Sequence, residues 1–302
     1  MRKFLLVCLL MKLGVALAVA APLQVVALHP LMADLARQVG GERVAVFDLV
    51  GDGGNLHRFE PRPADMQQMQ AADLVLAAGK NLEPYLGRLR SALAGITVVE
   101  VGRTIPSLTV VKGESDAHDS EHEGHGSGSL DPHWWHGVDN MRRAARVVAM
   151  ALADKDPAGK GYFEDRAGAY GMRLEALKHW ARSELERVPR GQRKLVTAHN
   201  AFGYFGLEFG FEVIAVAGLN KEQNTTPRQQ ADTIAAVQQA GVRAVFPEKN
   251  SNGKMLDLIA SATATRLGTP LIADGNGTGQ DAGFEAMIRH NVLAITQALI
   301  AP

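Results

Sequence analysis

The stretch 157–189, PAGKGYFEDRAGAYGMRLEALKHWARSELERVP, carries the pattern of one long helix. Its apolar side chains recur at steps of three and four residues, at Phe163, Ala167, Tyr170, Leu174, Leu177, Ala181, Leu185 and Val188. This spacing places them on a single helical face. At 1.5 Å per residue, a helix of about 30 residues is on the order of 45 Å long, enough to run across two globular units. We predict one rigid linking helix over residues 155–190.

Short β-rich runs alternate with helical patterns on both sides of this helix. Strands are expected at 24–28, 44–50, 74–77 and 97–101, and again at 194–198, 213–216, 244–246 and 271–273. Such alternation is typical of βα units on a parallel sheet. We predict an α/β fold of two lobes, residues 21–154 and 191–302, each with a mainly parallel four-stranded sheet.

The N-terminus has the features of an export signal. A positive start at Arg2 and Lys3 precedes an apolar run that ends in the small-residue pattern Ala18-Val19-Ala20, so residues 1–20 are predicted to be a signal peptide. Lys12 interrupts the run and leaves it short of the ~20 residues of a membrane span. The only cysteine, Cys8, lies too early to be lipidated at the cleavage point. We therefore expect a soluble periplasmic product without a lipid anchor.

Charge and composition exclude some partners. The formal net charge is 0, and removal of Arg2, Lys3 and Lys12 with the signal peptide leaves −3. A negative mature chain makes nucleic acid an unexpected partner. A hydrophobic content of 46% over the full chain is enough for one large core or two modest ones, and we expect the mature protein to be a monomer.

Histidines gather in one segment. Five of the ten histidines lie between His118 and His136. Residues 114–129 are acidic and glycine-rich and lack aliphatic periodicity, which predicts a flexible loop in the first lobe. Imidazoles and carboxylates together favour a divalent metal. His118, His122 and His125 are predicted to hold such ions loosely.

Four further residues follow predicted strands. His57 comes after the strand that ends near residue 50, His199 and Asp274 close two later strands, and His133 lies in the loop after the last strand of the first lobe. In open α/β sheets, ligands bind beyond the carboxyl ends of the strands. We expect these side chains to meet in a cleft between the lobes, where three imidazoles and one carboxylate satisfy tetrahedral zinc.

Four segments resemble a known family. Residues 55–65 (NLHRFEPRPAD) resemble the His-x-(Tyr/Phe)-Glu-Pro-x-Pro-x-Asp segment of metal-binding proteins that serve ABC importers. Residues 131–135 look like their Asp-Pro-His-x-Trp, residues 197–205 like their His-Asp-Ala-Phe-Gly-Tyr-Phe, and residues 245–248 like their Phe-x-Glu. The similarity covers nearly the whole mature chain, and it is to the cluster A-I, ZnuA-like periplasmic zinc-binding proteins, especially the AztC type.

This resemblance implies a two-lobed clamp that binds one metal ion and delivers it to an ABC permease in the inner membrane, with a periplasmic metallochaperone as a further possible partner. The family's metal positions fall on His57, His133, His199 and Asp274. Manganese-binding members tend to have a carboxylate at the third of these positions. The presence of His199 there favours Zn(II) over Mn(II) as the transported ion.

The chain also departs from the family pattern. Asn200 replaces the usual aspartate and supplies no charge to orient His199. His136 is either a spare ligand or a partly exposed histidine on a cleft loop. Glu60 and Glu248 are predicted to support the site or the fold rather than to bind metal. His29, His179 and His290 are expected at the surface or in packing.

Some features of the sequence would also suit an enzyme. His118–His122 matches the inverted zinc-protease pattern His-x-x-Glu-His, but its flanks lack the apolar stripe of a stable helix. A three-histidine site also suits a zinc hydrolase or hydratase. If Asp274 binds the ion directly, protein groups close the site, which favours carriage over catalysis. In a third interpretation, adhesion or metal buffering, the histidine segment is the functional element. We predict a binding protein, not an enzyme.

Overall fold

The structure, a computed structural model, describes residues 21–51, 54–110, 129–217, 226–249, 251, 253–275 and 282–300. The predicted signal peptide and the histidines of the 114–129 loop lie outside these residues. Among the residues described, no helix combines the length and apolar character needed to cross a membrane.

The N-terminal lobe is built on a parallel sheet in the order β2-β1-β3-β4. Its strands are β1 (Leu23–Ala27), β2 (Val44–Asp48), β3 (Leu74–Ala77) and β4 (Thr97–Glu100). Helices α1 (Pro30–Gly40), α2 (Pro63–Gln70) and α3 (Leu86–Ala92) connect them. The short antiparallel pair β5 (Thr109–Val110) and β6 (Ser129–Leu130) leads to α4 (Val138–Lys155).

The C-terminal lobe repeats the plan, with the strand order β10-β9-β7-β8, all parallel. Its strands are β7 (Lys194–His199), β8 (Glu212–Ala217), β9 (Ala244–Phe246) and β10 (Arg266–Leu267). Helices α6 (Gly203–Phe209), α7 (Pro227–Ala240), α8 (Lys254–Thr263) and α9 (Phe284–Ile300) complete it. The predicted α/β architecture of two parallel four-stranded sheets is confirmed.

The segment predicted as the last strand, 271–273, differs from expectation. It makes only one bridge, between Glu248 and Leu271, and the fourth strand of the sheet is β10. The reason is that the backbone of Ile272 makes its hydrogen bonds with a side chain and not with a strand. Ile272 N–H donates to the Asn291 side chain and Ile272 C=O accepts from it, at 2.8 Å each. The Asn291 side chain thus takes the place of a neighbouring strand at Ile272.

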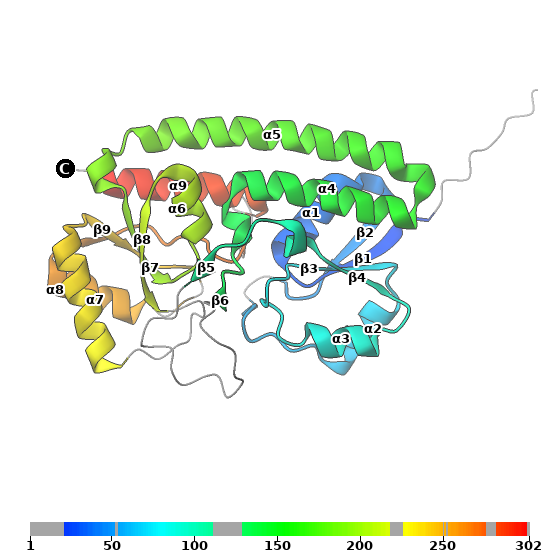
Figure 1. Ribbon diagram of the computed structural model, residues 1–302, viewed down its shortest axis with the longest axis horizontal. Helices are drawn as coiled ribbons and strands as arrows, with labels where there is room; N and C mark the ends of the chain where they lie inside the picture. The colour runs from blue at the N-terminus through cyan, green and yellow to red at the C-terminus, as the bar shows by residue number, and fades with distance from the viewer. Residues whose placement is uncertain are drawn as a thin grey trace, which may run out of the picture.

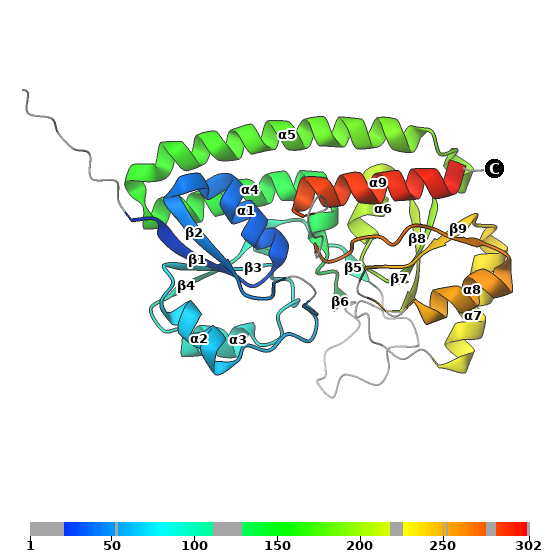
Figure 2. The ribbon, with the colours of Figure 1, turned by 180° about the vertical axis from the view of Figure 1, so that it is seen from behind.

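The long helix α5 (Lys160–Glu186) has 27 residues and spans both lobes (Figures 1 and 2). In both views α4 and α1 lie beneath its N-terminal half, and α9 lies beside its C-terminal half. The predicted apolar stripe, from Phe163 to Val188, is buried throughout. The helix therefore joins the lobes through one continuous packed face.

Strand periodicity divides the core into layers. In β1, Val25 and Ala27 face the large cluster shared with α1, α4, α5 and α9, whereas Val26 packs with α3 on the opposite face. In β7, Leu195 belongs to the shared cluster and Val196 to a separate one under α8. Because the shared cluster continues from one lobe into the other, the two sheets are held in a fixed relation along the α5 side.

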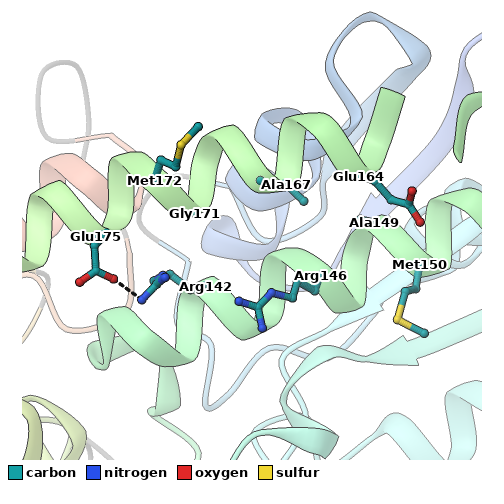
Figure 3. Close-up of a pocket in the computed structure, with 10 residues that line it drawn as sticks. Arg142, Arg146, Ala149, Met150, Glu164, Ala167, Gly171, Met172 and Glu175 are labelled. Carbon is teal, nitrogen blue, oxygen red and sulfur yellow. Dashed lines mark ion pairs between the residues drawn. The ribbon is translucent and has the colours of Figure 1, made fainter. Parts of the chain in front are cut away.

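A groove of about 530 Å³ lies between α4 and α5, on the helical side of the molecule (Figure 3). Gly168 and Gly171 line it, Met150 and Met172 stand at its edges, and Arg142 pairs with Glu175 across it. None of the predicted metal ligands lines this groove.

Candidate metal site

One group of potential metal ligands stands out in the described part of the chain. Ligand atoms of His57, His133, His199 and Asp274 all lie within 4.8 Å of one another. The three imidazole ring centres are 5.1 to 5.7 Å apart. All four residues were singled out from the sequence, and the fold brings them together from four separate segments.

The His133 ring is held by the carboxylate that precedes it. Asp131 Oδ1 accepts hydrogen bonds from His133 N and Nδ1, at 2.9 Å each, and both residues are buried. A ring whose Nδ1–H donates to a carboxylate keeps its lone pair on Nε2. His133 therefore presents Nε2 to the site, where it lies 3.4 Å from His57 Nε2.

The His199 ring is held in the same way by a distant residue. His199 is the last residue of β7, and Glu248 follows β9, the neighbouring strand. Glu248 Oε1 accepts from His199 N at 3.0 Å, and Oε2 accepts from Nδ1 at 2.6 Å. Because this carboxylate accepts hydrogen bonds from both the backbone and the ring of His199, it fixes the tautomer of the ring and directs Nε2 toward the other ligands.

His57 forms the exposed side of the site. Its backbone N–H donates to Asn55 Oδ1 at 3.0 Å, in the loop after β2. His57 is half-buried, whereas His133 and His199 are 0% exposed and Asp274 is 3% exposed. Among the four residues, His57 is therefore the one most accessible to solvent.

The segment that carries Asp274 is fixed by two aromatic side chains. Ala273 O accepts a hydrogen bond from Trp135 Nε1 and another from His136 Nε2, both at 2.8 Å. Trp135 also packs edge-on against His133, with ring centres 5.3 Å apart. The turn after His133 thus positions the residue next to Asp274, which couples the ligands of the two lobes.

The remaining predicted residues take different places. His136 is fully buried, not partly exposed, and burial lowers its pKa to about 3. Its Nε2 is occupied by Ala273 O. Glu60 lies at the surface opposite Arg88, and the group that orients His199 is Glu248, while Asn200 is half-buried.

Two residues beside the site were not assigned to it from the sequence. Asp131 is part of the Asp-Pro-His segment, and its place two residues before His133 is the signal that could have identified it. His29 was expected at the surface or in packing. It is the buried N-cap of α1, and its Nδ1 accepts from Leu31 N at 3.0 Å.

Replacement of Glu248 by glutamine tests the orientation of His199. The glutamine amide offers only one acceptor oxygen to two N–H donors, so the His199 ring loses its fixed tautomer. We expect Glu248→Gln to weaken metal binding by roughly 10- to 100-fold. Competition against a chromophoric chelator measures the change. Glu60→Gln, at an exposed glutamate, is the control, and equal Kd values for the two variants would contradict the role of Glu248.

Comparison with known proteins agrees with this geometry. Residues 25–298 match the family described as ZnuA, zinc-uptake complex component A, periplasmic. The chain belongs to this family. Members are substrate-binding proteins of metal ABC transporters, so this ZnuA-family protein is a metal-binding transport component with a membrane permease as its partner, and not an enzyme.

Individual relatives are similar along most of their length. The manganese-binding lipoprotein MntA of Halalkalibacterium halodurans is 29% identical over 273 residues, covering 89% of this chain and 86% of the relative. The zinc-binding protein TroA of Treponema pallidum is 29% identical over 277 residues, with the same shares covered. The solved structure of the Treponema pallidum periplasmic zinc-binding protein TroA superposes with a TM-score of 0.81 at 27% identity, covering 93% of this chain and all of that one.

Proposed function

We propose that this ZnuA-family protein captures one Zn(II) ion in the periplasm through His57, His133, His199 and Asp274, and delivers it to an ABC permease for high-affinity import. The observation that carries the proposal is the convergence of these four ligand atoms within 4.8 Å. Two of the rings are tied at Nδ1 to carboxylates, which leaves their Nε2 atoms available to the ion.

The donor set favours zinc. Three imidazole nitrogens and one carboxylate oxygen suit tetrahedral zinc, whereas manganese prefers carboxylate, carbonyl and water oxygens. Two nitrogens that bind one tetrahedral zinc ion at 2.0–2.1 Å lie about 3.4 Å apart. The separation between His57 Nε2 and His133 Nε2 is 3.4 Å.

Elemental analysis of the purified protein, followed by competitive titration with Zn(II) and Mn(II), tests the proposal. We expect one zinc ion per chain and a lower Kd for zinc than for manganese. Mn(II) is the second candidate, since MntA, a similar protein, is named manganese-binding. Tighter binding of manganese would identify Mn(II), not Zn(II), as the transported ion. A metal-to-chain ratio near zero for both ions would overturn the proposal.

We also propose that His118, His122 and His125 collect ions and pass them to the four-ligand site. These residues lie outside the described part of the chain, so support comes from their composition. Ligands held in place by a folded structure lose little conformational entropy on binding, so we expect the four-ligand site to retain the ion at equilibrium.

Deletion of the predicted histidine-rich loop separates the capture of ions from their retention. Ser129 pairs with Val110, so the deletion should run from Glu114 to Gly128 and keep β6 intact. We expect an unchanged equilibrium Kd and slower zinc uptake from weak chelators, measured by stopped-flow mixing. Loss of zinc retention in the deletion protein would contradict this division of roles.

The mature protein is further proposed to be a monomer. It is also proposed to have no lipid anchor, because Cys8 precedes the predicted cleavage point. Delivery by a periplasmic metallochaperone and kinship to the AztC type also stay proposals.

A further inference from the structure

His29 is a buried histidine with a fixed tautomer. It is 0% exposed, and its Nδ1 accepts a hydrogen bond from Leu31 N at 3.0 Å. A nitrogen that accepts carries no proton, so the proton of the ring lies on Nε2. His29 Nε2 has no hydrogen-bond partner among the described residues. A buried N–H donor without an acceptor is destabilising, and an apolar side chain at this position would avoid that cost.

The His29 ring lies beside the segment that carries Asp274. Its centre is 4.4 Å from that of Trp135, and Trp135 Nε1 donates to Ala273 O. On the other side of Asp274, a Cβ atom added to Gly275 would lie 2.4 Å from Leu31 Cγ. Residues 29–31 at the start of α1 thus pack along residues 273–275. The carboxylate of Asp274 also exerts the leading Coulombic influence on the His29 ring.

A carboxylate that binds a cation through one oxygen has a second oxygen to satisfy. In a buried site this oxygen either turns to the same cation or accepts from a protein donor. His133 and His199 are imidazole ligands supported by carboxylates. Asp274 is a carboxylate ligand, and the buried His29 Nε2–H, which has no acceptor among the described residues, lies on a segment packed beside residues 273–275.

We propose that His29 is a positioning residue for Asp274: in the cation-loaded protein, His29 Nε2–H donates to the Asp274 oxygen that does not bind the ion. Asp274 then binds through one oxygen, and the site stays four-coordinate. This inference deepens the proposed zinc function and depends on it. Without the donor, Asp274 can bind through both oxygens, which raises the coordination number and favours manganese relative to zinc.

His29→Asn is the informative variant, because asparagine is among the best helix N-caps and retains the bond from Leu31 N while removing the Nε2–H donor. We expect Kd for Zn(II) to rise roughly 10-fold or more, with Kd for Mn(II) unchanged or lower. With Co(II) as a probe, the intense visible bands of a four-coordinate ion should weaken. His179→Asn, at an exposed histidine of α5, is the control.

The outcomes are distinct. Wild-type and His29→Asn proteins with the same ratio of zinc to manganese affinity and the same Co(II) spectrum would overturn the role of His29. So would a loss of thermal stability alone, since that is what a purely structural residue gives. A wild-type protein that does not prefer zinc defeats the proposed function instead.

A measurement on the wild-type protein keeps the inference testable if the variant does not fold. In the zinc-loaded protein labelled with ¹⁵N-histidine, His29 should appear as the Nε2–H tautomer with a slowly exchanging proton. A His29 ring protonated on Nδ1 would refute the proposed hydrogen bond.

Discussion

His199→Ala is expected to abolish functional metal binding, with the affinity for zinc lowered on the order of a thousandfold, or about 4 kcal/mol. The change removes one of four ligands. It also leaves Glu248, whose carboxylate grips His199 N and Nδ1, with a buried negative charge and one donor fewer. Competitive titration of the purified protein against a high-affinity chelator measures the loss.

His179→Ala serves as the matched control. His179 lies exposed on α5, paired with Glu175, and is not one of the four residues of the described metal site. Its zinc stoichiometry and Kd should equal those of the wild type. If His199→Ala retained one zinc ion per chain with an unchanged Kd, the four-ligand site would be wrong.

Acidification is expected to destabilise the metal-free protein through its buried neutral histidines. Burial lowers the pKa of His29 and of His136 to about 3, whereas an unfolded histidine titrates near 6.5. Between these values the unfolded state binds more protons, so stability falls as the pH falls below about 6.5. Each ring lowers the free energy of unfolding by about 1.4 kcal/mol per pH unit below about 6.5, or by about 2 kcal/mol at pH 5.

His136→Phe isolates one of these contributions. The variant loses the bond to Ala273 O at every pH but has no ring to protonate there. The difference in free energy of unfolding between wild type and variant should therefore shrink by about 2 kcal/mol from pH 7.5 to pH 5, measured by urea denaturation. His179→Phe should leave the pH profile unchanged. Parallel wild-type and His136→Phe profiles would show that His136 is not buried as a neutral ring.

The long helix and most strands were predictable because their signals are local. A stripe at steps of three and four predicted the buried face of α5, and short β-rich runs predicted strands such as β1, β3 and β7. The exception is 271–273. Its composition is that of a strand, but its backbone bonds with Asn291, a partner 19 residues away that no local pattern reveals.

The supporting shell of the site was less predictable than the ligands. His57, His133, His199 and Asp274 follow from residue type and from their position after strands. The sequence predicted His29 at the surface or in packing and His136 as either a spare ligand or a partly exposed loop residue, yet both are fully buried beside the site. These two residues are distinguished by their burial and by the group that each ring nitrogen faces. Neither property can be deduced from the residues next to them in the sequence.

The sequence by itself determined the two α/β lobes, the linking helix and the chemical kinds of ligand, because periodicity and strand-end positions are encoded over short stretches. Only the tertiary structure decided that Glu248 orients His199 across 49 residues and that His136 anchors Ala273 across 137. Hydrogen bonds over such separations depend on how the sheets and α5 pack together, and that packing is a property of the whole chain.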